Sequence, residues 1–290
     1  MIFVIMGPTA SGKSNAAHAL AKSLDCPIIN ADAFQIYKGM DIGTNKVSKD
    51  DDNYSRYYLL DIVEPNQTYS VMEYQRDFRR TLKELQNKYD NIVVCGGTGL
   101  YIRAATYDYE FSEENVPDET YDELSNEELH KKLEELDSKE AEKIHQNNRK
   151  RMIRAINLIS KSGESKSSLL DEQEHKPIFS NTEIKYLFIN PNREELYERI
   201  NERVDEMFGL GLVDEVKNLL NKYDLSLTAK QGIGYKEVIS YLSNEISLEE
   251  CKELIKKRTR NYAKRQVTFF KHQFEYQEFV SFKELIEFYK

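Results

Sequence analysis

A phosphate-binding signature near the start of the chain constrains its fold more than any other feature. Residues 7–14 read GPTASGKS, which matches G-x-x-x-x-G-K-S, and they follow the apolar run MIFVIM. This pattern is specific when it lies between a strand and a helix, and SNAAHALAKSL at residues 14–24 reads as a helix. The glycines allow backbone N–H groups to surround a phosphate, and the helix start adds partial positive charge. The sequence therefore predicts a P-loop that binds a diphosphate or triphosphate.

Strand-like and helix-like segments alternate through the N-terminal third. Apolar runs at residues 26–32, 57–63 and 91–99 alternate with an amphipathic segment at residues 70–89. This alternation predicts an α/β fold with a P-loop NTPase-like parallel sheet, covered by helices on both faces. Ligands of such sheets bind at the carboxyl ends of the strands. We therefore expect the turns GPTASGKS, NADAFQ and GGTGLY to converge on one cleft.

A change in composition near residue 110 predicts a second domain. Residues 108–142 hold fifteen acidic residues and three lysines, and residues 129–136 and 149–160 have helical patterns. Residues 161–177 are polar and predict a loop, after which IKYLFIN resumes the strand pattern. We expect a helical insertion domain at residues 110–178. The α/β core then comprises residues 1–109 and 179–290, and its helical C-terminal part ends in a long helix at about 247–272.

The charge of the chain is segregated. The net charge is −9, yet residues 143–161 hold six Lys/Arg and residues 256–271 hold seven, in both cases without an acidic residue. Affinity for a polyanion depends on the local field rather than on the net charge. A single basic run is usually a solvated helix face. On charge alone, a nucleic-acid partner and two solvated faces both remain possible.

Composition and residue spacing argue against several other classes of protein. The apolar runs are of strand length, so we expect no membrane span, and the N-terminus lacks the pattern of a signal peptide. Cys26, Cys95 and Cys251 are far apart in the sequence, and the five histidines are scattered. This spacing predicts neither a disulfide framework nor a His/Cys metal site. We expect a cytoplasmic protein with reduced thiols.

The P-loop signature itself is that of nucleotide-binding, and most often ATP-binding, proteins. Lys13 would reach terminal phosphate oxygens, and Ser14 would hold Mg²⁺. ATP and GTP enzymes usually also have an apolar strand that ends in an Asp for the metal. NIVVCGG ends without one, whereas YYLLDI offers Asp61, and no guanine-reading NKxD is present. An ATP-dependent kinase therefore remains an alternative.

A series of motifs, in order along nearly the whole chain, resembles the tRNA dimethylallyltransferases, also called tRNA isopentenyltransferases. The motifs are GPTASGKS, NADAFQIYKGMDIGT, LLDIVEPNQTYSV, GGTGLY, IHQNNRKRMIRAI, GLVDEV, QGIGYKE and TRNYAKRQVTFF. The resemblance implies that the P-loop holds dimethylallyl diphosphate rather than ATP. It also implies that the five-carbon group is transferred to N6 of the adenosine 3′-adjacent to the anticodon in tRNA, with release of diphosphate.

The resemblance also implies roles for individual residues. Asp32 is the general base, Thr98 lies at the reacting centre and Lys13 is catalytic. The diphosphate-binding residues are Gly7, Pro8, Thr9, Ala10, Ser11, Gly12, Lys13, Ser14 and Arg265, with Ser14 as the ligand of a Mg²⁺ cofactor. Other roles remain open from the residues alone. Asp32 would otherwise bind Mg²⁺ or cap a helix, the Thr98 hydroxyl would only cap the helix that follows it, and the Thr9 hydroxyl would only shape its loop.

The partners implied are tRNA and dimethylallyl diphosphate, with a monomeric enzyme and no membrane. The implied tRNA-binding residues are Asp32, Ala33, Phe34, Gln35, Lys150, Arg151, Met152, Ile153, Arg154, Gln231, Gly232, Ile233, Gly234, Tyr235 and Lys236. On the last long helix, Arg260 and Lys264 are four residues apart, so we expect them to share a face and reach phosphates together.

The chain departs from the family pattern at three places. Ala33 stands where the family usually has Ser, residues 147–151 read NNRKR rather than NDxxR, and the arginine-bearing stretch expected after VPDE is not recognisable. The sequence shows no zinc-finger extension, which favours a bacterial-type enzyme.

Two further alternatives are a prenyltransferase acting on free AMP and a tRNA-binding protein without catalysis. The basic runs and the insertion favour a macromolecular substrate over AMP.

Overall fold

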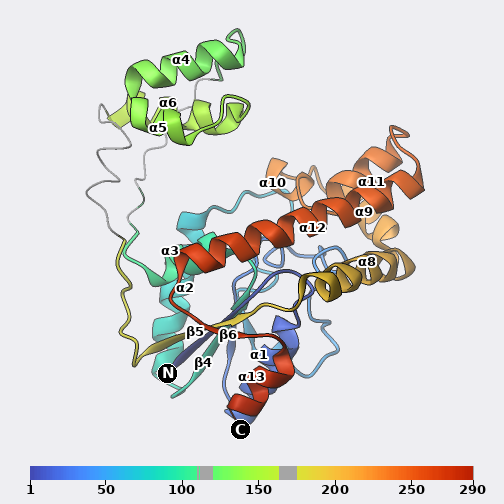
Figure 1. Ribbon diagram of the computed structural model, residues 1–290. Coiled ribbons are helices and arrows are strands. Elements are labelled where there is room, and N and C mark those ends of the chain that lie inside the picture. Colours follow the sequence, from blue (N-terminus) through green and yellow to red (C-terminus); the bar gives the residue numbers. More distant parts are fainter. Residues whose placement is uncertain (110, 112–119, 163–174, 290) are drawn as a thin grey trace. The chain divides into compact units, whose positions relative to one another are not determined.

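The computed structural model describes residues 1–109, 111, 120–162 and 175–289 (Figure 1). The chain divides into two compact units, one formed by Met1–Tyr107 with Pro177–Lys290 and the other by Asp108–Lys176. The sequence placed the corresponding boundaries at residues 110 and 178.

The first unit is built on a six-stranded sheet in the order β3-β2-β4-β1-β5-β6, with every pair parallel. The predicted α/β class and P-loop NTPase-like sheet are confirmed. Strand β1 is central, since Ile2 pairs with both Ile92 and Ile184, and all of its residues are buried. The strands are β1 (Ile2–Met6), β2 (Ile28–Asn30), β3 (Tyr57–Tyr58), β4 (Ile92–Gly96), β5 (Ile184–Ile189) and β6 (Gln277–Phe279).

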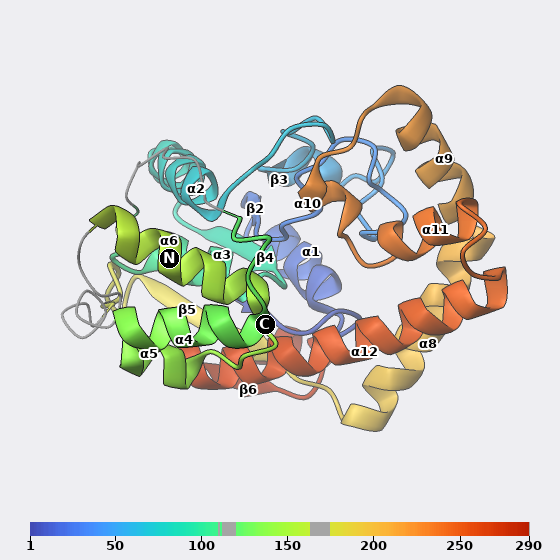
Figure 2. The ribbon, with the colours of Figure 1, turned by 90° about the horizontal axis from the view of Figure 1, so that it is seen from above.

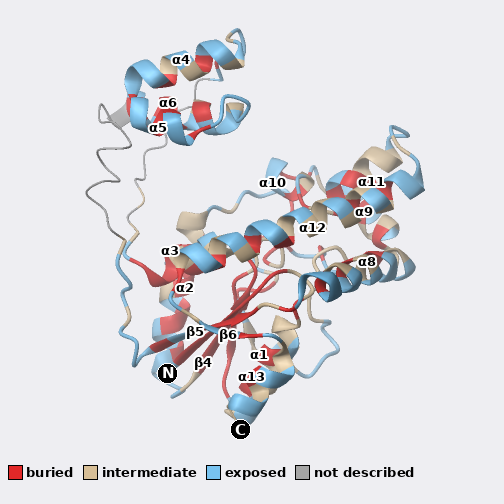
Figure 3. Cartoon of the chain, viewed as in Figure 1, coloured by how far each residue is buried: buried red, intermediate tan, exposed pale blue. Residues whose placement is uncertain are grey.

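Helices cover both faces of the sheet. Helices α1 and α13 pack against one face, where Leu20 and Leu285 share a core with Ile5 of β1. Helices α2 and α3 belong to the other face, and their Tyr74 and Tyr101 rings stack with centroids 4.1 Å apart. Burial follows this layering, with the strands and the inward helix faces buried (Figure 3). The helices are α1 (Lys13–Ser23), α2 (Val71–Gln86), α3 (Gly99–Thr106) and α13 (Phe282–Phe288).

The helices that follow β5 form a second core of the same unit. Ile36, Tyr37 and Met40, from the segment after β2, pack there against Val204 and Leu212. This core therefore includes the segment that follows the carboxyl end of β2. The long helix α12 runs past the helices before it (Figures 1 and 2). These helices are α8 (Arg193–Gly209), α9 (Leu212–Lys222), α10 (Leu227–Lys230), α11 (Tyr235–Leu242) and α12 (Leu248–Gln273).

Two parts of the first unit differ from the sequence-based expectation. Residues 57–63 form a strand only at β3, because Leu59 and Asp61 adopt left-handed backbone with φ of 58° and 53° and turn the chain away. The C-terminal part was predicted to be helical throughout, but β6 adds a strand to the edge of the sheet beside β5. Three residues are too few to show a strand period.

The second unit contains α4 (Asn126–Leu136), α5 (Ser138–Lys143) and α6 (Arg149–Ser162), around a core that includes Leu129, Leu133 and Ile156. The Ser125 hydroxyl and the Glu128 carboxylate form a capping box at the start of α4. Residues 163–174 of the predicted polar loop lie outside the described residues, and residues 161–162 belong to α6.

Two further expectations concern cysteines and membranes. Cys26, Cys95 and Cys251 are buried free thiols. Over the ranges that the structure describes, no helix combines the length and apolar character needed to cross a bilayer.

Candidate active site

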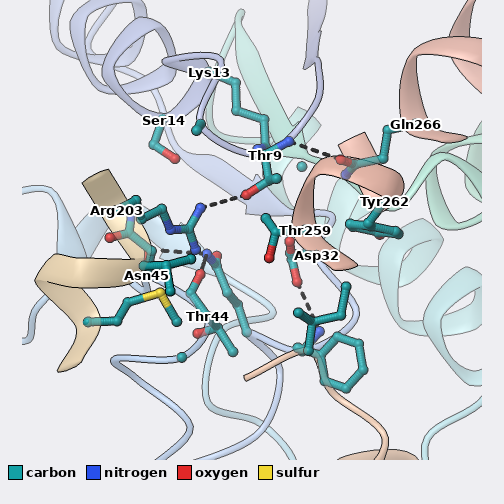
Figure 4. A pocket seen from close by; sticks show the side chains of 18 of the residues that line it. Thr9, Lys13, Ser14, Asp32, Thr44, Asn45, Arg203, Thr259, Tyr262 and Gln266 are labelled. Carbon is teal, nitrogen blue, oxygen red and sulfur yellow. Dashed lines mark hydrogen bonds between the residues drawn. The ribbon is translucent and has the colours of Figure 1, made fainter. Parts of the chain in front are cut away.

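The three predicted turns converge, because β2, β4 and β1 are neighbours in the sheet and all point the same way. They open onto one cavity of about 480 Å³ (Figure 4). The cavity is also lined from α8 and α12, which do not belong to the strand–turn pattern. The main polar lining residues are Thr9, Lys13, Ser14, Asp32, Gln35, Thr44, Asn45, Arg203, Gln231, Thr259, Tyr262, Arg265 and Gln266.

The P-loop has the geometry that its sequence predicts. Gly12, with φ of +89°, immediately precedes α1, and this left-handed conformation favours glycine. A Cβ at Gly7 would lie 2.6 Å from the Ile189 carbonyl oxygen of β5, so the loop also needs glycine there. Of the predicted diphosphate-binding residues, the cavity is lined by Thr9, Ala10, Gly12, Lys13, Ser14 and Arg265. Gly7, Pro8 and Ser11 lie behind it, where the Ser11 N–H donates to the Pro8 carbonyl.

Lys13 is a half-buried cation that lines the cavity. Its ammonium donates to the Pro8 carbonyl at 3.3 Å. Burial lowers the pKa of this group, and the nearby Arg203 lowers it further, whereas Cys95 and Asp32 act in the opposite direction. Burial likewise raises the pKa of the Cys95 thiol to about 11, so this neighbour is uncharged at neutral pH. The site therefore presents a partly desolvated positive charge to any bound anion.

Arg203 of α8 is a second half-buried cation at the cavity, and no sequence motif pointed to it. Its Nη1 donates to the Thr9 hydroxyl at 2.6 Å, which brings the guanidinium to the P-loop (Figure 4). Burial lowers the pKa of this guanidinium, and Asp32 and Glu206 oppose that effect. In the sequence, Arg203 lies in the helical segment RINERVDEMF, where an arginine among acids usually indicates a surface ion pair. No local pattern marks it as a cavity residue.

Asp32 is fixed at the end of β2 by its neighbours. The Asn30 side-chain amide donates to the Leu59 carbonyl at 3.0 Å, and its oxygen accepts the Asp32 N–H at 3.2 Å. The Asp32 carboxylate oxygen Oδ1 accepts the Phe34 N–H at 3.0 Å, which forms an Asx turn. The carboxylate is thereby held in the cavity without capping a helix, so the helix-cap alternative for Asp32 is wrong.

Thr98 joins the turns that follow β4 and β2. Its hydroxyl accepts the Ala33 N–H at 2.9 Å, and it makes no side-chain bond to the start of α3. The alternative in which this hydroxyl caps α3 is therefore wrong. The two turns are in direct contact, since a Cβ at Gly96 would lie 2.1 Å from the Ala31 carbonyl oxygen. Ala33, where the family usually has Ser, contributes its backbone to this junction.

One side chain of α12 bridges two of the three turns. The Gln266 amide oxygen accepts the Thr9 N–H at 2.9 Å, and its nitrogen donates to the Gly97 carbonyl at 2.8 Å. Tyr262, one turn earlier, also lines the cavity, and burial raises the pKa of its hydroxyl to about 12, with a further contribution from Asp32. This hydroxyl is therefore a hydrogen-bond donor at neutral pH.

Arg260 and Lys264, which were expected to share a face and reach phosphates together, differ in their surroundings, because Arg260 is half-buried. Arg260 Nη1 donates to the side-chain oxygen of Asn201 on α8, which holds the guanidinium within the unit, whereas Lys264 is exposed.

The residues at the cavity suit a magnesium ion that is bound mainly by a substrate. In the described ranges, no group of three or more His, Cys, Asp or Glu side chains could hold a metal by itself. Ser14 and Asp32 supply a hydroxyl and a carboxylate to the same cavity. Mg²⁺ is commonly held in this way, by one or two protein oxygens together with phosphate oxygens and water.

Asp61, the metal ligand of the kinase alternative, is occupied elsewhere. Its Oδ1 accepts from the Lys46 ammonium at 2.6 Å, and its Oδ2 accepts from the Tyr54 hydroxyl at 2.9 Å. Lys46 itself is almost fully buried in this ion pair. Asp61 does not line the cavity. The structure therefore removes the residue on which the kinase alternative depended.

The predicted tRNA-binding residues fall into three places. Phe34, Gln35, Gln231 and Ile233 line the cavity with Asp32, and Lys236 is exposed nearby in the chain. Tyr235 was predicted to contact tRNA, but it is only 1% exposed and its hydroxyl donates to Glu215 at 2.7 Å. Tyr235 is therefore part of the protein interior, although it also belongs to the residues that line the cavity. Gly232 and Gly234 belong to the turn before α11, where Gly234 has φ of +97°.

The third place is α6 of the second unit. Lys150, Arg151 and Arg154 are exposed on this helix and remain available to a phosphate backbone. Met152 is completely buried in the core of its unit and Ile153 packs against that core, so neither side chain has the exposure of Lys150, Arg151 and Arg154. Arg149 has a structural role, because its guanidinium donates to the carbonyls of Leu124 and Tyr121.

Comparisons with known proteins agree with the motif resemblance. The IPP transferase family model matches residues 35–273. A tRNA dimethylallyltransferase of Bacillus mycoides is 39% identical over 282 residues, which cover 94% of this chain and 88% of that protein. The tRNA delta(2)-isopentenylpyrophosphate transferase of Staphylococcus epidermidis superposes with a TM-score of 0.71 at 34% identity, covering 99% and 96% of the two chains.

A eukaryotic dimethylallyltransferase acting on tRNA superposes with a TM-score of 0.79 at 25% identity, covering 96% of this chain and 73% of that one. The resemblance drawn from the ordered motifs is thereby confirmed, and the protein is an enzyme. The chain belongs to the IPP transferase family.

Proposed function

We propose that this enzyme transfers the dimethylallyl group of dimethylallyl diphosphate to N6 of the adenosine 3′-adjacent to the anticodon in tRNA, and releases diphosphate. One observation carries the proposal. A single cavity is lined by the P-loop with its cation Lys13, by a second cation, Arg203 of α8, and by a fixed carboxylate, Asp32. A transfer from a diphosphate to a nitrogen that must lose a proton needs both parts.

The P-loop side of the cavity suits the leaving group. The C–O bond of an allylic diphosphate breaks when the negative charge that develops on the diphosphate is stabilised. Backbone N–H groups at the start of α1 and the side chains of Lys13, Arg203 and Arg265 supply that stabilisation. Because Lys13 and Arg203 are desolvated before substrate binds, their interaction with an anion is stronger than it would be in water.

The other side of the cavity suits the nucleophile. The adenine must leave its stack to enter the cavity, as bases do in enzymes that modify them. As the bond from N6 to the prenyl carbon forms and the C–O bond breaks, a proton leaves N6, and we assign its acceptance to the Asp32 carboxylate. Thr98 binds the backbone of the turn that carries Asp32 and so orients this base.

Mg²⁺, held by Ser14 and substrate oxygens, would neutralise part of the diphosphate charge. Two groups of residues would bind the tRNA. The exposed Lys150, Arg151 and Arg154 of α6 would contact backbone phosphates, which position a nucleic acid without reading its sequence. Phe34, Gln35 and Gln231 would lie near the extruded base, since they share the cavity with Asp32.

A transfer assay tests the proposal. The purified enzyme is incubated with Mg²⁺, dimethylallyl diphosphate labelled in its carbon chain, and unmodified tRNA, with AMP and ATP as acceptors in parallel reactions. We expect label in tRNA at the adenosine beside the anticodon. Label in AMP alone would instead indicate a cytokinin-forming type of transferase. Binding of tRNA without transfer of label would indicate that the departures at Ala33 and residues 147–151 have abolished catalysis.

A further inference from the structure

Three sequence motifs, GLVDEV, KGMDIGT and QGIGYKE, meet at one carboxylate to which the proposed reaction assigns no role. Glu215 of GLVDEV lies in the first turn of α9. Its Oε2 accepts the N–H groups of Asp41 and Ile42 at 3.0 and 2.7 Å. Its Oε1 accepts the Gly43 N–H at 3.1 Å and the Tyr235 hydroxyl at 2.7 Å. Asp41–Gly43 belong to KGMDIGT, and Tyr235 belongs to QGIGYKE.

This arrangement fixes a backbone segment strongly. Successive N–H groups that point to one place form a nest that suits an anion, and here an internal carboxylate occupies it. Each of these bonds is assisted by the charge of Glu215. Burial and the proximity of Glu215 raise the pKa of the Tyr235 hydroxyl well above its ordinary value, so this group stays protonated and donates.

The segment held in this way forms a wall of the active-site cavity. Gly43, Thr44 and Asn45 line the cavity, and the Gln35 side-chain nitrogen donates to the carbonyls of Thr44 and Asn45. Asn45 adopts left-handed backbone, with φ of +52°. In Figure 4, Thr44 and Asn45 are seen toward the side of Arg203, and Tyr262 and Gln266 are seen on the other side. We call residues 41–45 the donor-side wall.

The donor-side wall has no room to shift toward α11. A Cβ at Gly43 would lie 2.4 Å from Cε2 and 2.7 Å from the hydroxyl oxygen of Tyr235. The backbone of the wall therefore rests directly on the Tyr235 ring, which is itself buried. The position of the wall is set from two directions, by the Glu215 carboxylate and by the Tyr235 ring.

We propose that Glu215 is a positioning residue that fixes the donor-side wall and thereby sets the affinity of the enzyme for its prenyl diphosphate. The inference rests on the proposed function for the identity of this ligand. Glu215 does not line the cavity itself, and it acts on the substrate through the groups that it fixes, the wall residues 43–45 and Tyr235.

The first test compares Glu215→Gln with a matched control. Gln has nearly the same shape, but its NH₂ group faces N–H donors and cannot replace the second carboxylate oxygen. The control is Asp214→Asn, which removes the same charge from the adjacent, exposed position of α9. We expect Glu215→Gln to raise the Kd for dimethylallyl diphosphate, measured by calorimetry without tRNA, by about tenfold or more, as displaced positioning groups do.

Three further measurements separate positioning from a general loss of structure. The Kd for tRNA should stay within about twofold in Glu215→Gln, and Asp214→Asn should match the wild type in both affinities. Amide hydrogen exchange of residues 41–43 should become faster in Glu215→Gln and stay unchanged in Asp214→Asn. Gly43→Ala, which pushes the wall from the Tyr235 side, should weaken binding of dimethylallyl diphosphate in the same way.

Unchanged exchange at residues 41–43, or equal losses of affinity for both ligands, would overturn the inference. The exchange and donor-binding measurements need no turnover. A wild-type enzyme that binds dimethylallyl diphosphate without transferring it would therefore contradict the proposed function alone.

Discussion

At the scale of single residues, the active site combines cations that burial destabilises with one carboxylate that is held by backbone. Lys13 and Arg203 both have pKa values lowered by burial, and Asp32 opposes the effect at both. A diphosphate that enters the cavity restores the interactions that these cations lost with water. Folding thus removes part of the water from these two cations before the substrate binds, so binding requires less further desolvation.

The lowered pKa of Lys13 leads to a prediction for the pH dependence. Because its pKa lies below 10.5, Lys13 loses its proton at a lower pH than an exposed lysine would. The kcat/KM for dimethylallyl diphosphate reports the free enzyme. It should be constant while Lys13 is protonated and should fall as the pH rises through the lowered pKa. In Lys13→Arg the alkaline fall should move to higher pH, and an identical profile would show that another group causes it.

The role of Asp32 can be tested with its turn kept intact. Asp32→Asn retains an oxygen that can accept the Phe34 N–H and removes only the base. We expect kcat to fall by about 10²-fold or more, which is the effect of losing a general base. The Kd values for tRNA and dimethylallyl diphosphate should change little. Near-normal turnover of this variant would assign the proton transfer to another group.

At the scale of secondary-structure elements, α12 holds the active-site turns together. Gln266 bonds both the P-loop and the turn after β4, and it is only 6% exposed. Because Tyr262 and Arg265 lie on the same helix, a displacement of α12 would move cavity groups as well as the loops. The cavity is therefore completed by a helix that lies more than 150 residues away in sequence from the turns it joins.

Replacing Gln266 should lower stability as well as activity. Gln266→Leu leaves the Thr9 N–H and the buried Gly97 carbonyl without their partner. Such a loss costs about 1–3 kcal/mol in the free energy of unfolding, which urea denaturation measures. The matched control is Lys264→Gln, at an exposed position on the same helix, which should stay within about 0.5 kcal/mol of the wild type. A wild-type midpoint in Gln266→Leu would show that water replaces the side chain without loss.

The elements also show how far a sequence can predict such a site. The strand–turn pattern predicted that the P-loop and the turns NADAFQ and GGTGLY converge, and the family resemblance then singled out Asp32 and Thr98 within those turns. Arg203 could not be found in this way, because its role depends on the packing of α8 beside the P-loop. The burial of Met152 follows from which face of α6 meets the core of its unit, and a motif match carries no information on that.

At the scale of the whole molecule, charge is distributed very unevenly. The chain has a net charge of −9, but its exposed α6 carries Lys150, Arg151 and Arg154 close together in sequence. In an acidic protein, a local basic face attracts a polyanion that the net charge would otherwise repel. Such a distribution favours one orientation of a bound nucleic acid.

A few basic side chains should accordingly account for the salt dependence of tRNA binding. We expect the wild-type affinity to fall linearly in log–log form with salt, by about 0.7–0.9 per phosphate contacted. Arg151→Gln should weaken binding and reduce that slope by about one. Arg149→Gln is not an equivalent change, because Arg149 supports the fold of its unit and its loss should appear in thermal unfolding. A slope that is unchanged by Arg151→Gln would place the phosphate contacts elsewhere.

The first unit is continuous across the point where the chain leaves it. Tyr107 and Pro177 form an isolated bridge, and the Ile178 N–H donates to the Thr106 carbonyl. Residues 108–176 therefore leave and rejoin the first unit at neighbouring positions, as the two ends of a loop do. A short turn joining Tyr107 to Pro177 would shorten the chain without moving any strand or either cation of the cavity. The shortened protein would be a natural starting scaffold onto which modules that recognise other acceptors could be grafted.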